Sequence, residues 1–287
     1  IPFTGTGDED TVRNISRNDL INFHNKYYSL DNATLIVVGN IQTDKLKNIL
    51  EKNIHNFQTK KSKKIMFSKI NNLSNPLSNK NKTKIYLIDK ENSPQSLILG
   101  AQLLPPSSNE SSPFLNMAID ILGGTFTSRV NMNLREDKGW TYGAKVFPFD
   151  AKKQRPLFYY APVQSNKTAD SLFELISETK KFKTSTPPTE TELNRFISSY
   201  IRSLPGNFET NSSHLLALSE IIEFDRGLDY IMKNQKMIST MKVDSLTPHI
   251  SDHINLDETI WLIIGDLDII EKSLREKFSY PIVILDK

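Results

Sequence analysis

The sequence has 287 residues, of which 38% are hydrophobic and 24% are charged, so the chain has enough apolar material to bury a core. Its 36 Lys and Arg residues against 33 Asp and Glu residues give a formal charge of +3, an excess too small to indicate a nucleic-acid-binding protein. Because the chain has no Cys, disulfide frameworks, thiolate zinc sites and cysteine nucleophiles are excluded.

The chain begins with Ile1 rather than Met, and no signal-like segment follows. We therefore expect it to be a piece of a longer protein, with some of the chemistry in the part that precedes it. The longest strongly apolar run near the other end, residues 261–264, is far short of the roughly 20 residues of a membrane helix. We expect no membrane span.

Two helices and a strand are predicted before residue 57. Ser16 stands three residues before Asp19, close to a capping box, and apolar residues then recur at helical spacing, which predicts a helix over residues 16–28. Residues 33–38 read Ala-Thr-Leu-Ile-Val-Val and are closed by Gly-Asn, which predicts a buried strand. Thr43 begins a second amphipathic helix.

The positive charge is concentrated between the two predicted domains. Eight Lys and no acid occur from residue 57 to residue 84, so the rest of the chain carries a formal charge of −5. The same stretch is rich in Asn and Ser, which predicts a linker at residues 58–83. A polyanion patch is the alternative, but no aromatic residues are interleaved for base stacking, and we expect no nucleic-acid partner.

Paired strands followed by runs of helices are predicted after the linker. The predicted strands are residues 84–88, 95–104, 140–149 and 157–163, and the helices between and after them are residues 114–122, 127–137, 170–182 and 212–224. Thr189 and Glu192 form a capping box at the start of a further helix. This order indicates an α+β fold, a two-layer sandwich of antiparallel sheet and helices.

The two ends of the chain repeat one pattern at an offset of 226 residues. Leu20 falls on Leu246, Asp31 on Asp257 and Gly39 on Gly265. Both copies read as a helix, a Leu-Asp turn, a buried strand and a second helix, which indicates a duplicated domain. We therefore expect residues 1–57 to be the tail of one half-domain and residues 84–287 to be a second, whole one.

Residues 122–143, LGGTFTSRVNMNLREDKGWTYG, form the most informative motif of the chain. The segment resembles the non-catalytic half-domain of the insulinase/pitrilysin/processing-peptidase family of zinc peptidases, especially its large tandem bacterial members. The resemblance rests on Gly-Gly followed by Ser-Arg, on Leu-Arg-Glu, and on a Tyr seven residues after the second Arg. The flanking Pro-Gln-Ser at 94–96 and Ala-Pro-Val-Gln at 161–164 agree with it.

The resemblance implies a clam-like chamber made of two half-domains. The zinc site, an inverted His-x-x-Glu-His helix with a distal Glu, lies in the first half of such proteins, so we expect no metal in this chain and zinc in the catalytic half of the parent protein. The second half contributes an Arg and a Tyr that reach the bound peptide, which here are Arg135 and Tyr142. The alternative is that Arg135 pairs with a neighbouring carboxylate and Tyr142 packs on the sheet. Bacterial members are often exported, but the compartment stays open.

His249 and His253 form a second candidate site. They stand four residues apart with Asp252 between them, so on a helix both imidazoles would share one face, as zinc ligands do. The repeat places them on Phe23 and Tyr27, which are packing positions, and Asp is one methylene shorter than the usual Glu base. We expect these two residues to be structural and assign no catalytic or metal-binding residue in this chain.

The expected function is therefore that of the non-catalytic, peptide-binding portion of a zinc metalloendopeptidase. Its partners would be a peptide or unfolded protein substrate and the catalytic half-domain. A peptide is expected to add as an extra strand to exposed edges at residues 95–104 or 140–149. The alternatives are an inactive scaffold or partner subunit of the same family, and peptidase activity of this chain alone through His249 and His253.

Overall fold

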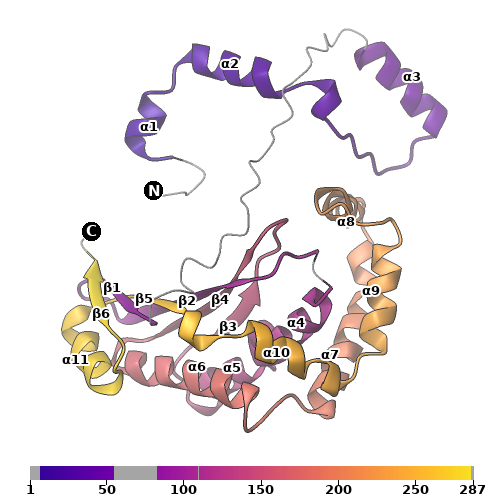
Figure 1. The fold of residues 1–287 in the computed structure, drawn as a ribbon. Coiled ribbons are helices and arrows are strands. Elements are labelled where there is room, and N and C mark those ends of the chain that lie inside the picture. The colour runs from indigo at the N-terminus through magenta and orange to yellow at the C-terminus, as the bar shows by residue number, and fades with distance from the viewer. Residues whose placement is uncertain (1–6, 55–82, 109, 286–287) are drawn as a thin grey trace. The chain divides into compact units, whose positions relative to one another are not determined.

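The structure, a computed structural model, describes residues 7–54, 83–108 and 110–285. It divides into two units, residues 1–73 with 209–219, and residues 74–208 with 220–287 (Figure 1). The predicted linker at 58–83 lies outside the described residues except for Thr83, and the predicted domain boundaries remain a prediction.

Residues 7–54 of the first unit contain three α-helices, α1 (Glu9–Arg13), α2 (Arg17–Tyr27) and α3 (Thr43–Ile54), and residues 209–219 of this unit contain most of α8 (Asn211–Glu223). The capping box predicted at the start of α2 is present, since the Ser16 hydroxyl accepts from the Asp19 backbone N–H while the Asp19 carboxylate accepts from that of Ser16. None of the three helices has a buried residue, and Leu20 is 61% exposed. Local signals therefore define these helices without a core of their own.

The strand predicted at residues 33–38 is wrong. The segment follows a 3₁₀ turn at Leu30–Asn32 but makes no strand pairing, and Leu35 is 60% exposed. A strand forms only when its N–H and C=O groups meet those of a neighbour, and the described residues of this unit contain no other strand. Residues 33–38 therefore have the apolar pattern of a strand but no neighbouring strand with which to pair among the described residues of this unit.

The second unit is built on one six-stranded sheet in the order β3-β4-β2-β5-β1-β6. The strands are β1 (Ile85–Asp89), β2 (Gln95–Leu104), β3 (Lys145–Pro148), β4 (Arg155–Gln164), β5 (Ile260–Gly265) and β6 (Ile282–Leu285). Strand β2 is antiparallel to β4 and β5, and β3 to β4, whereas β1 is parallel to both β5 and β6. The sheet is mixed rather than wholly antiparallel, because helical crossovers let distant strands run in the same direction.

Helices form the second layer, which confirms the α+β two-layer fold. Against one face of the sheet lie α4 (Ser112–Ile119), α5 (Arg129–Asn131), α6 (Thr168–Lys183), α10 (Thr247–His253) and α11 (Leu267–Lys277) (Figure 1). Burial alternates along β2 and β4, because every second side chain points toward the helices. The remaining helices of this unit are α7 (Glu190–Ser203) and α9 (Tyr230–Ser239), and only the last turn of α8, from Glu220 on, belongs to it. Helix α9, which the sequence did not predict, packs beside α7.

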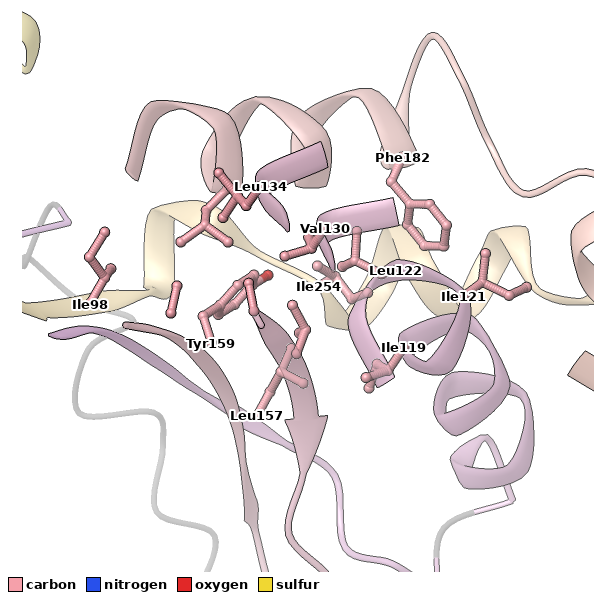
Figure 2. Packing of buried hydrophobic residues seen from close by; sticks show 14 of the residues in the cluster. Ile98, Ile119, Ile121, Leu122, Val130, Leu134, Leu157, Tyr159, Phe182 and Ile254 are labelled. Atoms are coloured by element: carbon pink, nitrogen blue, oxygen red, sulfur yellow. The ribbon is translucent and has the colours of Figure 1, made fainter. Parts of the chain in front are cut away.

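The core lies between the sheet and the helices (Figure 2). Leu157 and Tyr159 rise from β4 toward Leu122 and Val130, and all four are fully or almost fully buried. The buried Trp261 of β5 lies against Tyr159 with ring centroids 5.2 Å apart. Burial of such large side chains stabilises the unit most strongly at the middle of the sheet.

The second copy of the internal repeat belongs to this core. The 3₁₀ turn at Leu30–Asn32 in the first copy has its counterpart at Leu256–Glu258 in the second, again 226 residues later. The strand of the second copy is β5. Leu246 and Ile254 are fully buried here, whereas the matching Leu20 and Tyr28 of the first copy are exposed. The strand of the second copy, β5, thus pairs with β1 and β2, whereas the matching segment of the first copy pairs with no strand among the described residues.

Candidate functional site

The signature motif folds around a close contact between helix and strand. Asp120–Gly124 forms a π-helical turn after α4, and a Cβ on Gly123 would lie 2.5 Å from the backbone N, Cβ and Cγ2 of Val146 in β3. Only glycine allows the turn to approach the strand this closely. The Gly-Gly pair therefore fixes the position of everything that follows it in the motif.

Arg129, the first Arg of the motif, has a structural role. Its Nε and Nη2 each donate at 2.7 Å to one carboxylate oxygen of Glu192, and Nη2 also donates to the Pro187 carbonyl at 2.9 Å. Burial alone would raise the pKa of Glu192, but the bonds from Arg129 and Thr189 outweigh it and lower that pKa. The pair joins α5 to the start of α7 and leaves Arg129 unavailable to a ligand.

Arg135, the second Arg, is reachable from solvent. It lies on the π-helical segment Met132–Asp137, its Cζ is 4.7 Å from the ring centroid of Phe126, and its side chain is 38% exposed. Its Nε lies 3.2 Å from a carboxylate oxygen of the neighbouring Glu136, so the pairing considered as an alternative is present. An exposed pair of this kind contributes at most about 1 kcal/mol, so a ligand can displace Glu136.

Tyr142 stands at the other end of the same loop and is 86% exposed, so it does not pack on the sheet. The loop turns at Gly139, whose φ of +65° is the left-handed conformation that favours glycine and whose N–H donates to the Arg135 carbonyl at 3.1 Å. The Thr141 hydroxyl oxygen then accepts a hydrogen bond from the Gly143 N–H at 3.0 Å. Local hydrogen bonds therefore define the backbone between the two predicted site residues.

Asn131 ties the two sides of this loop together. Its buried amide donates through Nδ2 to the Phe126 carbonyl at 2.7 Å and accepts through Oδ1 from the Ala144 N–H at 3.1 Å. Neither Asn131 nor Phe126 was identified as a site residue from the sequence. The available signal was a polar residue at a helical position facing the core, which requires a buried partner.

Of the two strands expected to accept a peptide strand, only β3 lies at an edge of the sheet. Strand β2 lies between β4 and β5, so it has no open edge. Strand β3 is an edge strand, and because the Phe149 N–H bonds the Pro156 carbonyl, the outward groups belong to Ala144, Val146 and Pro148. The Ala144 N–H bonds Asn131, Val146 abuts Gly123 and Pro148 has no N–H. The expected strand addition to β2 is therefore wrong, whereas addition to β3 stays a prediction for its outward carbonyl groups.

His249 and His253 form part of an aromatic stack. The ring of Phe114 lies 4.9 Å from that of His249, which lies 6.5 Å from that of His253, with interplanar angles of 22° and 11°. Burial lowers the pKa of His253, and nearby His249 and Arg155 lower it further against the opposing effect of Asp252. Among the residues that the structure describes, no group of three or more His, Cys, Asp or Glu side chains could hold a metal ion.

Comparison with known proteins bears on this geometry. Residues 14–200 match the family model described as the peptidase M16 inactive domain, which is well over half of the chain. The chain belongs to the M16 peptidase family. The prediction of a non-catalytic portion of such a zinc peptidase, made from the motif at 122–143, is thereby confirmed at the level of the family and the inactive domain. No match to the sequence was found among curated proteins.

Solved structures of M16 proteins share the fold. An M16 inactive domain from Pseudomonas fluorescens aligns with a TM-score of 0.78 at 18% identity, over 91% of this chain and 60% of that one. A protease from Helicobacter pylori gives 0.77 at 17% identity, over 90% and 61%. The periplasmic protease PqqL from Escherichia coli gives 0.70 at 15% identity, over 95% and 30%. The chain thus spans about three fifths of the first two proteins and less than a third of the last.

Along the described parts of this M16 chain, no helix is long and apolar enough to cross a membrane. The M16 signature itself divides into two groups of residues. Gly123, Arg129 and Asn131 hold the loop in place, whereas Arg135 and Tyr142 present polar groups to solvent.

Proposed function

We propose that this chain is the peptide-binding, non-catalytic portion of a zinc-dependent metalloendopeptidase, in which Arg135 and Tyr142 contact the bound peptide. The observation that carries the proposal is the exposure of both side chains at the two ends of one rigidly hydrogen-bonded loop. The match to the M16 inactive domain supports it. Exposed Arg and Tyr side chains on an ordered loop are typical of binding sites.

The two side chains supply the donors that a peptide carbonyl needs. The Arg135 guanidinium carries a positive charge and several N–H groups, and the Tyr142 hydroxyl adds an O–H donor. In the parent protein a catalytic half-domain outside this chain would hold the zinc, which would supply an activated water for attack on the peptide bond. Arg135 and Tyr142 would orient the peptide from the opposite side and stabilise charge that develops on the carbonyl oxygen.

The alternative is an inactive scaffold or partner subunit of the same family. The contact that favours it is the ion pair between Arg135 and Glu136, which occupies one edge of the guanidinium. In a scaffold, both Arg135 and Tyr142 would be free to vary without loss of binding. The two functions therefore differ in whether an unfolded polypeptide binds at this loop.

The test is binding of fluorescein-labelled, reduced and carboxymethylated α-lactalbumin, an unfolded polypeptide, followed by fluorescence anisotropy. Hydrogen bonds to charged groups contribute about 1.5–3 kcal/mol, so Arg135→Ala should weaken binding by about tenfold or more. Tyr142→Phe, which removes only the hydroxyl, should weaken it by about two- to tenfold. Arg275→Ala is the matched control, because Arg275 pairs with Glu271 on an exposed helix face elsewhere. Equal affinity of all four proteins would favour the scaffold.

A further inference from the structure

Phe126 presents an unusually exposed aromatic ring at the candidate site. Phe126 is 54% exposed, although large apolar side chains such as phenylalanine are usually buried in a core. The ring contacts the guanidinium of Arg135, whose Cζ lies 4.7 Å from the ring centroid. This distance is within the range of a cation–π interaction.

The backbone that carries Phe126 is held on both sides. The Phe126 carbonyl accepts from Asn131 Nδ2 at 2.7 Å, and the carbonyl of the preceding Thr125 accepts from the Ser128 hydroxyl at 2.6 Å. Both donors belong to buried residues, Asn131 and Ser128. The ring is therefore exposed on a fixed loop, as expected of a residue that positions another group rather than one that fills space.

We propose that Phe126 is a positioning residue that holds the Arg135 guanidinium in the orientation in which it binds the peptide backbone. The inference rests on the proposed function. The Arg135 Cζ lies over the Phe126 ring, and this contact restricts the guanidinium while leaving N–H groups that can donate to a peptide carbonyl oxygen. Without the ring, Arg135 keeps only the exposed pair with Glu136, which does not fix its orientation.

The buried amide of Asn131 also connects the backbone of Phe126 to the segment that carries Tyr142. Asn131 donates to the Phe126 carbonyl and accepts from the N–H of Ala144, two residues after Tyr142. The backbone under Phe126 and the backbone after Tyr142 are thus held by the two ends of one side chain. The Phe126 ring that contacts Arg135 and the backbone next to Tyr142 therefore depend on the same side chain.

The test is a double-mutant cycle on the full chain, with the labelled α-lactalbumin as probe. Phe126→Leu keeps apolar bulk but removes the π-system, and an exposed cation–π contact corresponds to about a two- to fivefold loss of affinity. Phe126→Trp keeps the π-system and should bind within about twofold of the unchanged protein. In the double variant with Arg135→Ala, Phe126→Leu should add nothing, because it acts through Arg135. Phe173→Leu is the matched control, since Phe173 is an exposed ring under Lys277.

A second readout reports the geometry directly. The NMR signals of the Arg135 δ-methylene protons should be shielded by the ring and should shift downfield in Phe126→Leu but not in Phe173→Leu. Wild-type affinity of Phe126→Leu, or losses that add in the double variant, would overturn the positioning role while Arg135→Ala still binds weakly. If Arg135→Ala itself binds normally, the proposed function fails and this inference fails with it, even where the shift is observed.

Discussion

Asp120 follows the last residue of α4, where the chain widens into the π-helical turn, and a Cβ on Gly124 would collide with its carboxyl group. Burial raises the pKa of Asp120 to about 6. The folded protein therefore binds a proton at Asp120 more tightly than the unfolded chain does, and the charged form is held at a cost. The signature loop thus begins next to a carboxyl group whose burial makes its charged form unfavourable.

Asp120→Asn should stabilise the protein above about pH 6 and leave its stability nearly unchanged below about pH 4. The ionised carboxyl costs up to about 3 kcal/mol when its pKa is raised this far, and the neutral amide avoids that cost. The sign follows because the cost is absent below the unfolded pKa of 3.8 and is complete above the folded value. Urea denaturation at pH 4 and pH 8 measures the difference, with the exposed Glu276→Gln as control. An equal effect at both pH values would contradict this account.

Among the elements, α5 and α7 depend on one another through Arg129 and Glu192. Both side chains are less than one fifth exposed, and the pair has two N–H···O bonds in fork geometry. Removing one partner of such a pair leaves the other charge without compensation. The motif's first Arg therefore stabilises α5, which is followed directly by the π-helical segment that carries the second Arg.

Arg129→Ala should lower the free energy of unfolding by about 3 kcal/mol, because Glu192 would stay partly buried without its partner. The control Arg275→Ala removes an exposed i,i+4 pair and should cost less than about 1 kcal/mol. Chemical denaturation followed by circular dichroism compares the two variants. A loss at Arg129 no larger than that at Arg275 would show that the buried pair does not couple the helices.

The sequence predicts those elements whose signals are local. The capping boxes at Ser16 and Thr189 and the bounds of β2 are as expected, because they depend on neighbouring residues and on simple alternation. Residues 33–38 carry an equally strong strand pattern and form no strand, because pairing depends on a distant partner. The roles of Arg135 and Tyr142 stay a prediction, and the contacts of Phe126 and Asn131 arise only when the motif folds.

At the scale of the whole molecule, we expect peptide binding in this chain and metal chemistry outside it. His249 and His253 belong to a stack with Phe114, and the described residues include no group of three or more His, Cys, Asp or Glu side chains that could hold a metal ion. We therefore expect the purified chain to hold less than one equivalent of zinc by mass spectrometry after incubation with the ion and desalting. One equivalent that is lost in the His249→Ala/His253→Ala variant would overturn this assignment.

The central claim, that the loop carrying Arg135 and Tyr142 meets the peptide, is tested most directly by photo-crosslinking. The photoreactive amino acid p-benzoylphenylalanine is introduced at Tyr142 or, as a matched control, at Leu228, which is 84% exposed. The proteins are irradiated with labelled α-lactalbumin, and the crosslinked sites are mapped by mass spectrometry. The account predicts crosslinks from position 142 that unlabelled polypeptide competes away, and none from position 228. Equal crosslinking from both positions, or none from position 142, would contradict it.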